Sequence, residues 1–139
     1  MPVGSVTGNR NGRAHLVAGR RSPRSHVLTK AVGNTISGNW DVRNTGSVSG
    51  NAFLSLRNAS GAVLNSGPTS SVPGGSTASL VFNWLVTAAL PTGPNTLTLW
   101  MFQIDPVTGA NVEIASHVFT ATRPSDQAIL SPIGDPTII

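Results

Sequence analysis

Residues 77–86 carry the strongest constraint on the fold, because apolar and polar side chains alternate there. The apolar positions are Ala78, Leu80, Phe82 and Trp84. Successive side chains of a β-strand point to opposite faces of the sheet. The alternation therefore predicts a strand with one face in a core and the other face in solvent.

Two shorter alternating runs, residues 36–42 and 52–56, lie earlier in the chain and are separated by the sequence NTGSVSG. In this linker Asn44, Gly46 and Gly50 tolerate the positive φ angles that a tight strand reversal requires. We therefore expect the two runs to pair as an antiparallel hairpin.

The remaining strand signals complete one small β-sandwich. Trp40 is the predicted centre of its core, because an indole buries a large apolar area and fits a pleated surface. Residues 67–76 contain two prolines, which favours a crossover between sheets. With the runs above, the pattern predicts an all-β, antiparallel sandwich of about seven strands over residues 26–123. The further expected strands are residues 26–32, 62–65, 95–104 and 112–122.

The composition fits this class and excludes several others. The chain has 139 residues, of which 39% are hydrophobic and 10% are charged, so one packed domain is expected rather than disorder. It has no cysteine, which excludes a disulfide framework and a cysteine-ligated metal. It lacks an apolar run of about eighteen residues, so no transmembrane helix is expected. Its first residues also lack the apolar segment of a secretory signal.

Residues 1–25 are expected to form an extended basic arm, because glycines and prolines interrupt them and no regular period appears. Three interpretations remain open: a solvated tail, a tether for protein carboxylates, or an arm that contacts nucleic-acid phosphates without base stacking. No acidic residue occurs among the first thirty residues, which carry the candidate partner-binding cations. These are Arg10, Arg13, Arg20, Arg21, Arg24 and Lys30.

Residues 124–139 are expected to form a second extension, in which three prolines prevent regular structure. Its aliphatic side chains are too apolar for a solvated tail, so they need a groove on this subunit or on another. The candidate partner-binding residues here are Ile129, Leu130, Ile133, Ile138 and Ile139.

Residues 99–102 are continuously apolar, which predicts burial on both faces of a strand. One face would lie in the core, and the other would lie beneath an arm or a neighbour. Trp100 and Phe102 are therefore candidate interface aromatics. The alternative is that they cover a smaller cluster within the same chain.

The central block resembles the CARDB-type immunoglobulin-like domains and their fibronectin-like relatives. The segments that carry the resemblance are WDVRNTGS at 40–47, VPGGS at 72–76, LVFNW at 80–84 and PTGP at 91–94 before LTL at 97–99. The resemblance implies an immunoglobulin-like fold and a module of adhesion, filament or surface assembly without catalysis.

Chemistry-bearing residues do not form a recognisable catalytic pattern. The sequence has no G-x-S-x-G elbow and no phosphate-binding glycine loop. His117 has no second histidine nearby, which favours a structural role over metal binding. We therefore expect no enzyme activity, no catalytic residues, no cofactor and no metal.

The two extensions favour a structural protein of a large assembly. We expect a virion decoration or cement protein, or a minor capsid or tail protein, that assembles in the host cytoplasm. Its arm and tail would clasp neighbouring protein subunits, including other copies of itself, with no membrane partner. One alternative is an internal capsid protein that contacts nucleic acid through its arm. Another is an adhesion or pilus-like module at the cell surface.

Overall fold

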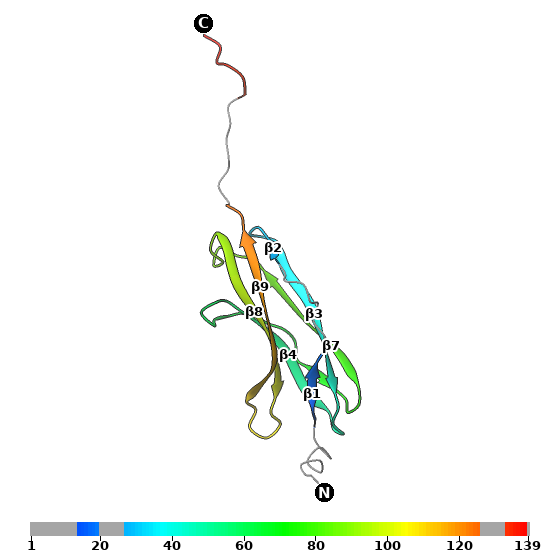
Figure 1. The fold of residues 1–139 in the computed structure, drawn as a ribbon. Helices are drawn as coiled ribbons and strands as arrows, with labels where there is room; N and C mark the ends of the chain where they lie inside the picture. The colour runs from blue at the N-terminus through cyan, green and yellow to red at the C-terminus, as the bar shows by residue number, and fades with distance from the viewer. Residues whose placement is uncertain (1–13, 20–26, 126–132, 139) are drawn as a thin grey trace.

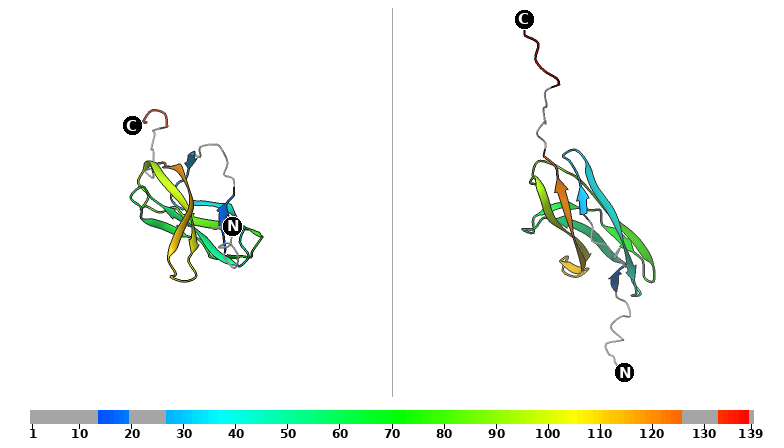
Figure 2. Two further views of the ribbon diagram at one scale, coloured as in Figure 1. Left: turned by 60° about the horizontal axis from the view of Figure 1, so that its bottom comes forward. Right: turned by 45° about the horizontal axis from the view of Figure 1, so that its top comes forward.

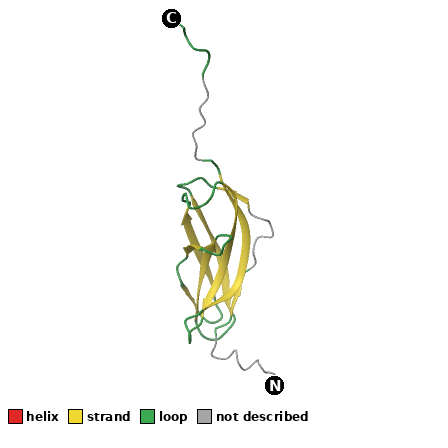
Figure 3. Cartoon of the chain, turned by 90° about the vertical axis from the view of Figure 1, so that its left-hand side faces the viewer, coloured by secondary structure: helices red, strands yellow, loops and turns green. Residues whose placement is uncertain are grey.

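The computed structural model describes residues 14–19, 27–125 and 133–138. Within these residues the chain forms nine β-strands and no helix, arranged as two sheets packed face to face (Figures 1 and 3). The predicted all-β sandwich is thus confirmed. In the same residues, no helix is present that could cross a membrane.

The smaller sheet has three strands in the order β1-β3-β7, and both of its pairings are antiparallel. Its strands are β1 (Leu16–Ala18), β3 (Thr35–Asn44) and β7 (Thr77–Leu85). The nine register pairs between β3 and β7 join the two most clearly alternating runs of the sequence.

The larger sheet has six strands in the order β2-β9-β8-β4-β5, with β6 also pairing with β4. The β2–β9 pair is parallel and the others are antiparallel. Figure 2 shows the two sheets from two further directions. The strands are β2 (Val27–Thr29), β4 (Gly50–Arg57), β5 (Val63–Ser66), β6 (Ser70–Val72), β8 (Gly93–Ile104) and β9 (Asn111–Arg123).

The core lies between the two sheets and is built from the inward faces of their strands. Trp40 is 7% exposed, as predicted for the centre of the core. The alternation in β7 is also confirmed, since Leu80, Phe82 and Trp84 are buried while Val81 and Leu85 are exposed. The largest fully buried side chains include Ile36, Leu54, Leu56, Leu97 and Met101.

The predicted hairpin between residues 36–42 and 52–56 is wrong, because β3 and β4 belong to different sheets. Residues 45–49 cross from one sheet to the other, and five residues suffice to span the separation of about 10 Å between packed sheets. Turn-forming residues are equally suited to either connection, so the composition of the linker could not distinguish them.

The asparagine and glycines of this linker were predicted to adopt positive φ angles, and they do not. Asn44, Gly46 and Gly50 do not have positive φ. Instead, a Cβ at Gly50 would lie 2.7 Å from the Ala14 Cβ, so a glycine is needed there to let the N-terminal segment pass. Positive φ does occur at Gly61 and Gly109, in two other turns of the chain.

The described residues form nine strands, compared with about seven expected. The two additional strands, β1 and β6, each have only three residues. β6 lies within the expected crossover 67–76, and β1 lies within the segment expected to be an extended arm. The sandwich therefore begins before residue 26.

Candidate interaction surface

The described start of the chain is fastened to the smaller sheet. Beyond the register pairs of β1 with β3, the Gly19 amide donates to the Asp41 carbonyl over 2.7 Å. The indole Nε1 of Trp40 donates to the Gly19 carbonyl over 2.9 Å. A Cβ at Gly19 would lie 3.0 Å from the Asp41 oxygen, so the two backbones approach closely.

Asn44 is fully buried and joins the N-terminal segment to the loop 45–49 and to the end of β6. Its Nδ2 donates to the carbonyls of Val48 (2.7 Å) and Val72 (2.8 Å), and its Oδ1 accepts from the amides of His15 (3.0 Å) and Gly46 (2.9 Å). Both N–H groups and both lone pairs of the side chain are thus used, as a buried amide requires.

Lys30 is the one predicted cationic contact residue that the structure describes. It follows β2, is half-buried, and its backbone amide donates to the Thr122 carbonyl over 2.9 Å. The other predicted cations lie outside the described residues. These are Arg10, Arg13, Arg20, Arg21 and Arg24.

An aromatic patch covers part of the outer face of the larger sheet, on β4 and β8. We define it as Phe53, Arg57, Trp100 and Phe102. The Phe102 ring centroid lies 5.6 Å from that of Phe53 and 5.9 Å from that of Trp100, and the Trp100 and Phe102 rings are stacked. The Arg57 Cζ lies 5.0 Å from the Phe102 centroid, over the ring. This is a cation–π arrangement.

The alternation of the strands explains why the patch lies outside the main core. Phe53 is opposite Phe102 in the β4–β8 register, while Leu54 is opposite Met101 and faces the core. Strand β4 is therefore buried on both of its faces. The predicted burial on both faces of β8 is also seen, since Leu99 and Phe102 are both buried.

The two predicted interface aromatics have different exposures. Phe102 is 8% exposed and lies inside the patch, as the alternative of a cluster within the same chain describes. Trp100 is half-buried and retains an accessible side. Trp100 is thus the aromatic residue of the patch that remains available to a partner.

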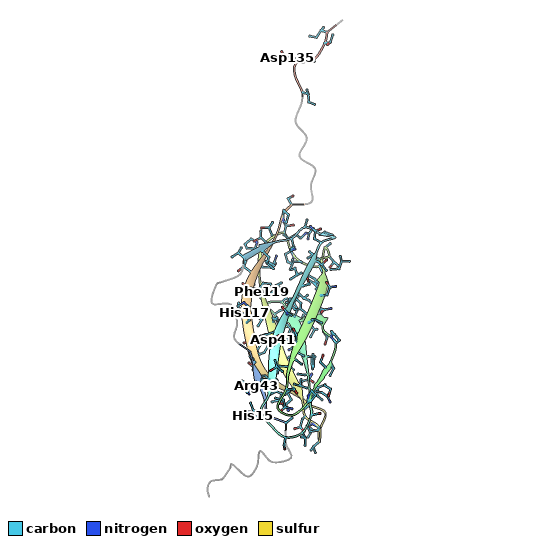
Figure 4. The ribbon with its side chains drawn as sticks, turned by 90° about the vertical axis from the view of Figure 1, so that its right-hand side faces the viewer. His15, Asp41, Arg43, His117, Phe119 and Asp135 are labelled. Carbon is cyan, nitrogen blue, oxygen red and sulfur yellow. The ribbon has the colours of Figure 1, made fainter. Side chains whose placement is uncertain are left out.

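Residues 133–138 lie beyond the end of the sandwich at which β9 ends (Figure 1). Ile133 is 100% exposed and Ile138 is 90% exposed, so these side chains do not occupy a groove of this subunit. Figure 4 shows Asp135 in this segment, at the opposite end of the molecule from His15. The remaining predicted tail contacts, Ile129, Leu130 and Ile139, lie outside the described residues.

His117 packs between aromatic rings at the boundary of the core. Its ring centroid is 6.5 Å from that of Trp40, edge to face, and 6.4 Å from that of Phe119, stacked. The described residues contain no group of three or more histidine, cysteine, aspartate or glutamate side chains that could hold a metal ion.

A scan against protein-family profiles and a search of curated proteins each found no match. Solved structures are similar in fold. The E. coli chaperone DraB aligns with 82% of this chain at 10% identity and a TM-score of 0.50. The periplasmic chaperone SfaE aligns with 85% at 12% identity and 0.48. The chain spans 57% and 61% of the length of these two proteins.

A third similar structure is the ASH / PapD-like domain 7 of human CEP192, which aligns with 82% of this chain at 13% identity, with 87% of the domain covered and a TM-score of 0.44. The chain has an immunoglobulin-like sandwich fold. At these identities the likeness concerns the fold alone. The more specific resemblance, to CARDB-type domains, stays a prediction from sequence.

Proposed function

We propose that this immunoglobulin-like chain is a non-enzymatic structural protein that clasps neighbouring subunits of a large assembly. The assembly we propose is a virion, with the chain as a decoration, cement, or minor capsid or tail protein. The observation that carries the proposal is the complete exposure of Ile133 and the near-complete exposure of Ile138, in a segment beyond the sandwich.

Burial of these side chains by a partner supplies the driving force. Removing one isoleucine side chain from water contributes about 1.5–3 kcal/mol, before the cost of ordering the segment. A few such contacts from an extended segment give modest affinity for one partner subunit. Repetition over a particle surface converts modest contacts into firm attachment.

The placement of the terminal segments supports contacts with more than one neighbour. His15 lies toward one end of the sandwich, and Asp135 lies beyond the other end (Figure 4). The described segments nearest the two termini thus lie toward opposite ends of the molecule, where they face different neighbours.

Site-specific photocrosslinking in the native host tests this function. A photoreactive amino acid replaces Ile133, and the matched control carries it at Val107, which is 90% exposed in the β8–β9 turn. We expect position 133 to crosslink to a repeated structural subunit of a sedimenting particle, and position 107 to do so much less. Equal crosslinking at both positions, or sedimentation of the protein only as free subunits, would contradict the proposal.

A further inference from the structure

The outer face of the larger sheet presents more apolar surface than the aromatic patch alone. Arg57 is opposite Thr98 on β8 and opposite Val63 on β5, and Thr98 is opposite Val118 on β9. Residues directly opposite each other in antiparallel strands share one face. Val63 and Val118 are 54% and 58% exposed. They extend the patch toward β5 on one side and toward β9 on the other, and both valines are accessible to solvent.

The segment 133–138 has the side chains that complement this surface. Its sequence, IGDPTI, combines two exposed isoleucines with one charge, the carboxylate of Asp135. The patch combines a half-buried indole with one charge, the guanidinium of Arg57. The segment and the patch thus each offer apolar surface, and each carries one charge, of opposite sign to the other.

The spacing of these groups also agrees. Trp100 and the Arg57 guanidinium both neighbour the Phe102 ring, at 5.9 Å and 5.0 Å from its centroid. Gly134 has a positive φ of 70°, so the chain bends between Ile133 and Asp135 and their Cα atoms lie less than about 7 Å apart. Ile133 can therefore rest on the Trp100 ring while Asp135 reaches Arg57. A guanidinium has five N–H donors, and Ser55 accepts one of them over 3.2 Å, from Nε.

We propose that residues 133–138 of one copy bind the aromatic patch of a second copy. This inference rests on the proposed function and names the acceptor of its C-terminal segment. The contact is heterologous, because a segment beyond one end of the sandwich meets a sheet face on the next molecule. Heterologous contacts repeat into rings or open filaments.

The direction of the chain favours a second copy over the same copy. Trp100 pairs with Ser116, which precedes the end of β9 at Arg123 by seven residues. Pro124 follows directly and favours an extended backbone. To reach its own patch, the segment would have to reverse and run back along β9. In the structure, residues 133–138 lie beyond the end of the sandwich instead (Figure 1).

Sedimentation velocity of full-length variants tests the proposal. The segment variant carries Ile133→Ser and Ile138→Ser, which touch nothing in the sandwich because both side chains are exposed. The patch variant carries Arg57→Glu. The control carries Leu85→Ser, a residue that is 56% exposed on the outer face of the smaller sheet.

We expect concentration-dependent oligomers for the wild type and the control, and monomers for each of the two variants. A mixture of the two variants should give a heterodimer and nothing larger, because it retains one intact segment and one intact patch. The charge-exchanged chain with Arg57→Glu and Asp135→Arg should regain association, at least tenfold over Arg57→Glu alone. This recovery distinguishes loss of the contact from loss of folding.

Three results would overturn the inference. A wild type that stays monomeric at every concentration removes the second copy as the partner. Association that the segment variant abolishes but Arg57→Glu leaves unchanged places the acceptor elsewhere. Failure of the charge exchange to restore association removes the pairing of Asp135 with Arg57. None of these results decides whether Ile133 crosslinks to another subunit, so the proposed function is tested separately.

Discussion

The indole N–H of Trp40 donates a 2.9 Å hydrogen bond to the carbonyl of Gly19, which ties the described N-terminal segment to the centre of the core. Trp40 is thus both a core residue and an anchor. Arg20 and Arg21, two of the predicted contact cations, follow this anchored glycine directly in the sequence. The fold therefore fixes the position of Gly19, the residue that precedes Arg20 in the sequence.

Replacing Trp40 with Phe should keep an aromatic ring in the core and remove the donor to Gly19. We expect a loss of stability of about 1–3 kcal/mol, from the unpaired carbonyl and the smaller ring. Protection of the Gly19 amide from hydrogen exchange should fall more than that of amides in β8. Trp84→Phe, in β7, is the matched control. If both variants deprotect Gly19 equally, the indole of Trp40 has no anchoring role.

Replacing Asn44 with Leu should be strongly destabilising, because it leaves the Val48 and Val72 carbonyls and the amides of His15 and Gly46 without their partner. With four backbone hydrogen bonds lost, two of them buried and two part-buried, we expect a loss of about 2–4 kcal/mol. Urea denaturation measures this loss. Asn39→Leu is the control, since its Nδ2 bonds an exposed Ser79 hydroxyl and the change should cost less than about 0.5 kcal/mol. Similar midpoints for the two variants would contradict the role of Asn44.

Replacing Gly67 with Ala should destabilise the junction between the two sheets. A Cβ at this position would overlap the Val81 carbonyl oxygen, and the Gly67 amide donates to the Leu54 carbonyl over 2.8 Å. Because the obstacle is backbone, we expect a cost of about 1–3 kcal/mol. Thermal unfolding measures it, with Ser66→Ala as the exposed neighbouring control. An unchanged melting temperature would mean that the backbone around Gly67 shifts away from Val81 without loss of stability.

Replacing Phe102 with Ala tests whether the aromatic patch is a second core. Phe102 is 8% exposed although it faces away from the other sheet, so we expect a loss of about 3–5 kcal/mol, as for a core phenylalanine. Val118→Ala, on the same outer face and 58% exposed, should cost less than about 0.5 kcal/mol. Chemical denaturation compares the two. Equal small losses would show that the patch contributes nothing to folding.

Local sequence patterns predicted the individual strands better than their partners. The alternation in residues 77–86 identified β7 because this strand has one buried and one exposed face, which is the condition for a period of two. The continuous apolar residues 99–102 likewise indicated burial on both faces. The hairpin between residues 36–42 and 52–56 was wrong because the choice of sheet depends on strands far along the chain, such as β8.

The N-terminal strand and its anchor were missed for a related reason. β1 has three residues among glycines and arginines, and its stability comes from β3, Trp40 and Asn44 rather than from its own sequence. One signal was the asparagine of Asn-Thr-Gly at residues 44–46, since an asparagine oxygen readily accepts from the amide two residues further on, here Gly46. That signal indicated the turn, but it did not reveal the contact with His15.

The entry and exit of the chain determine how the sandwich responds to tension. β1 is antiparallel to β3, β2 is parallel to β9, and the two terminal segments lie toward opposite ends (Figure 4). Force applied between them pulls along the strands and across their hydrogen bonds, so the bonds of each pair must shear together rather than peel one by one. Single-molecule stretching from the two termini should therefore need more force than stretching across the sheets. Two neighbouring subunits that hold the opposite ends of this molecule and move apart would therefore load it in the direction in which it resists force most.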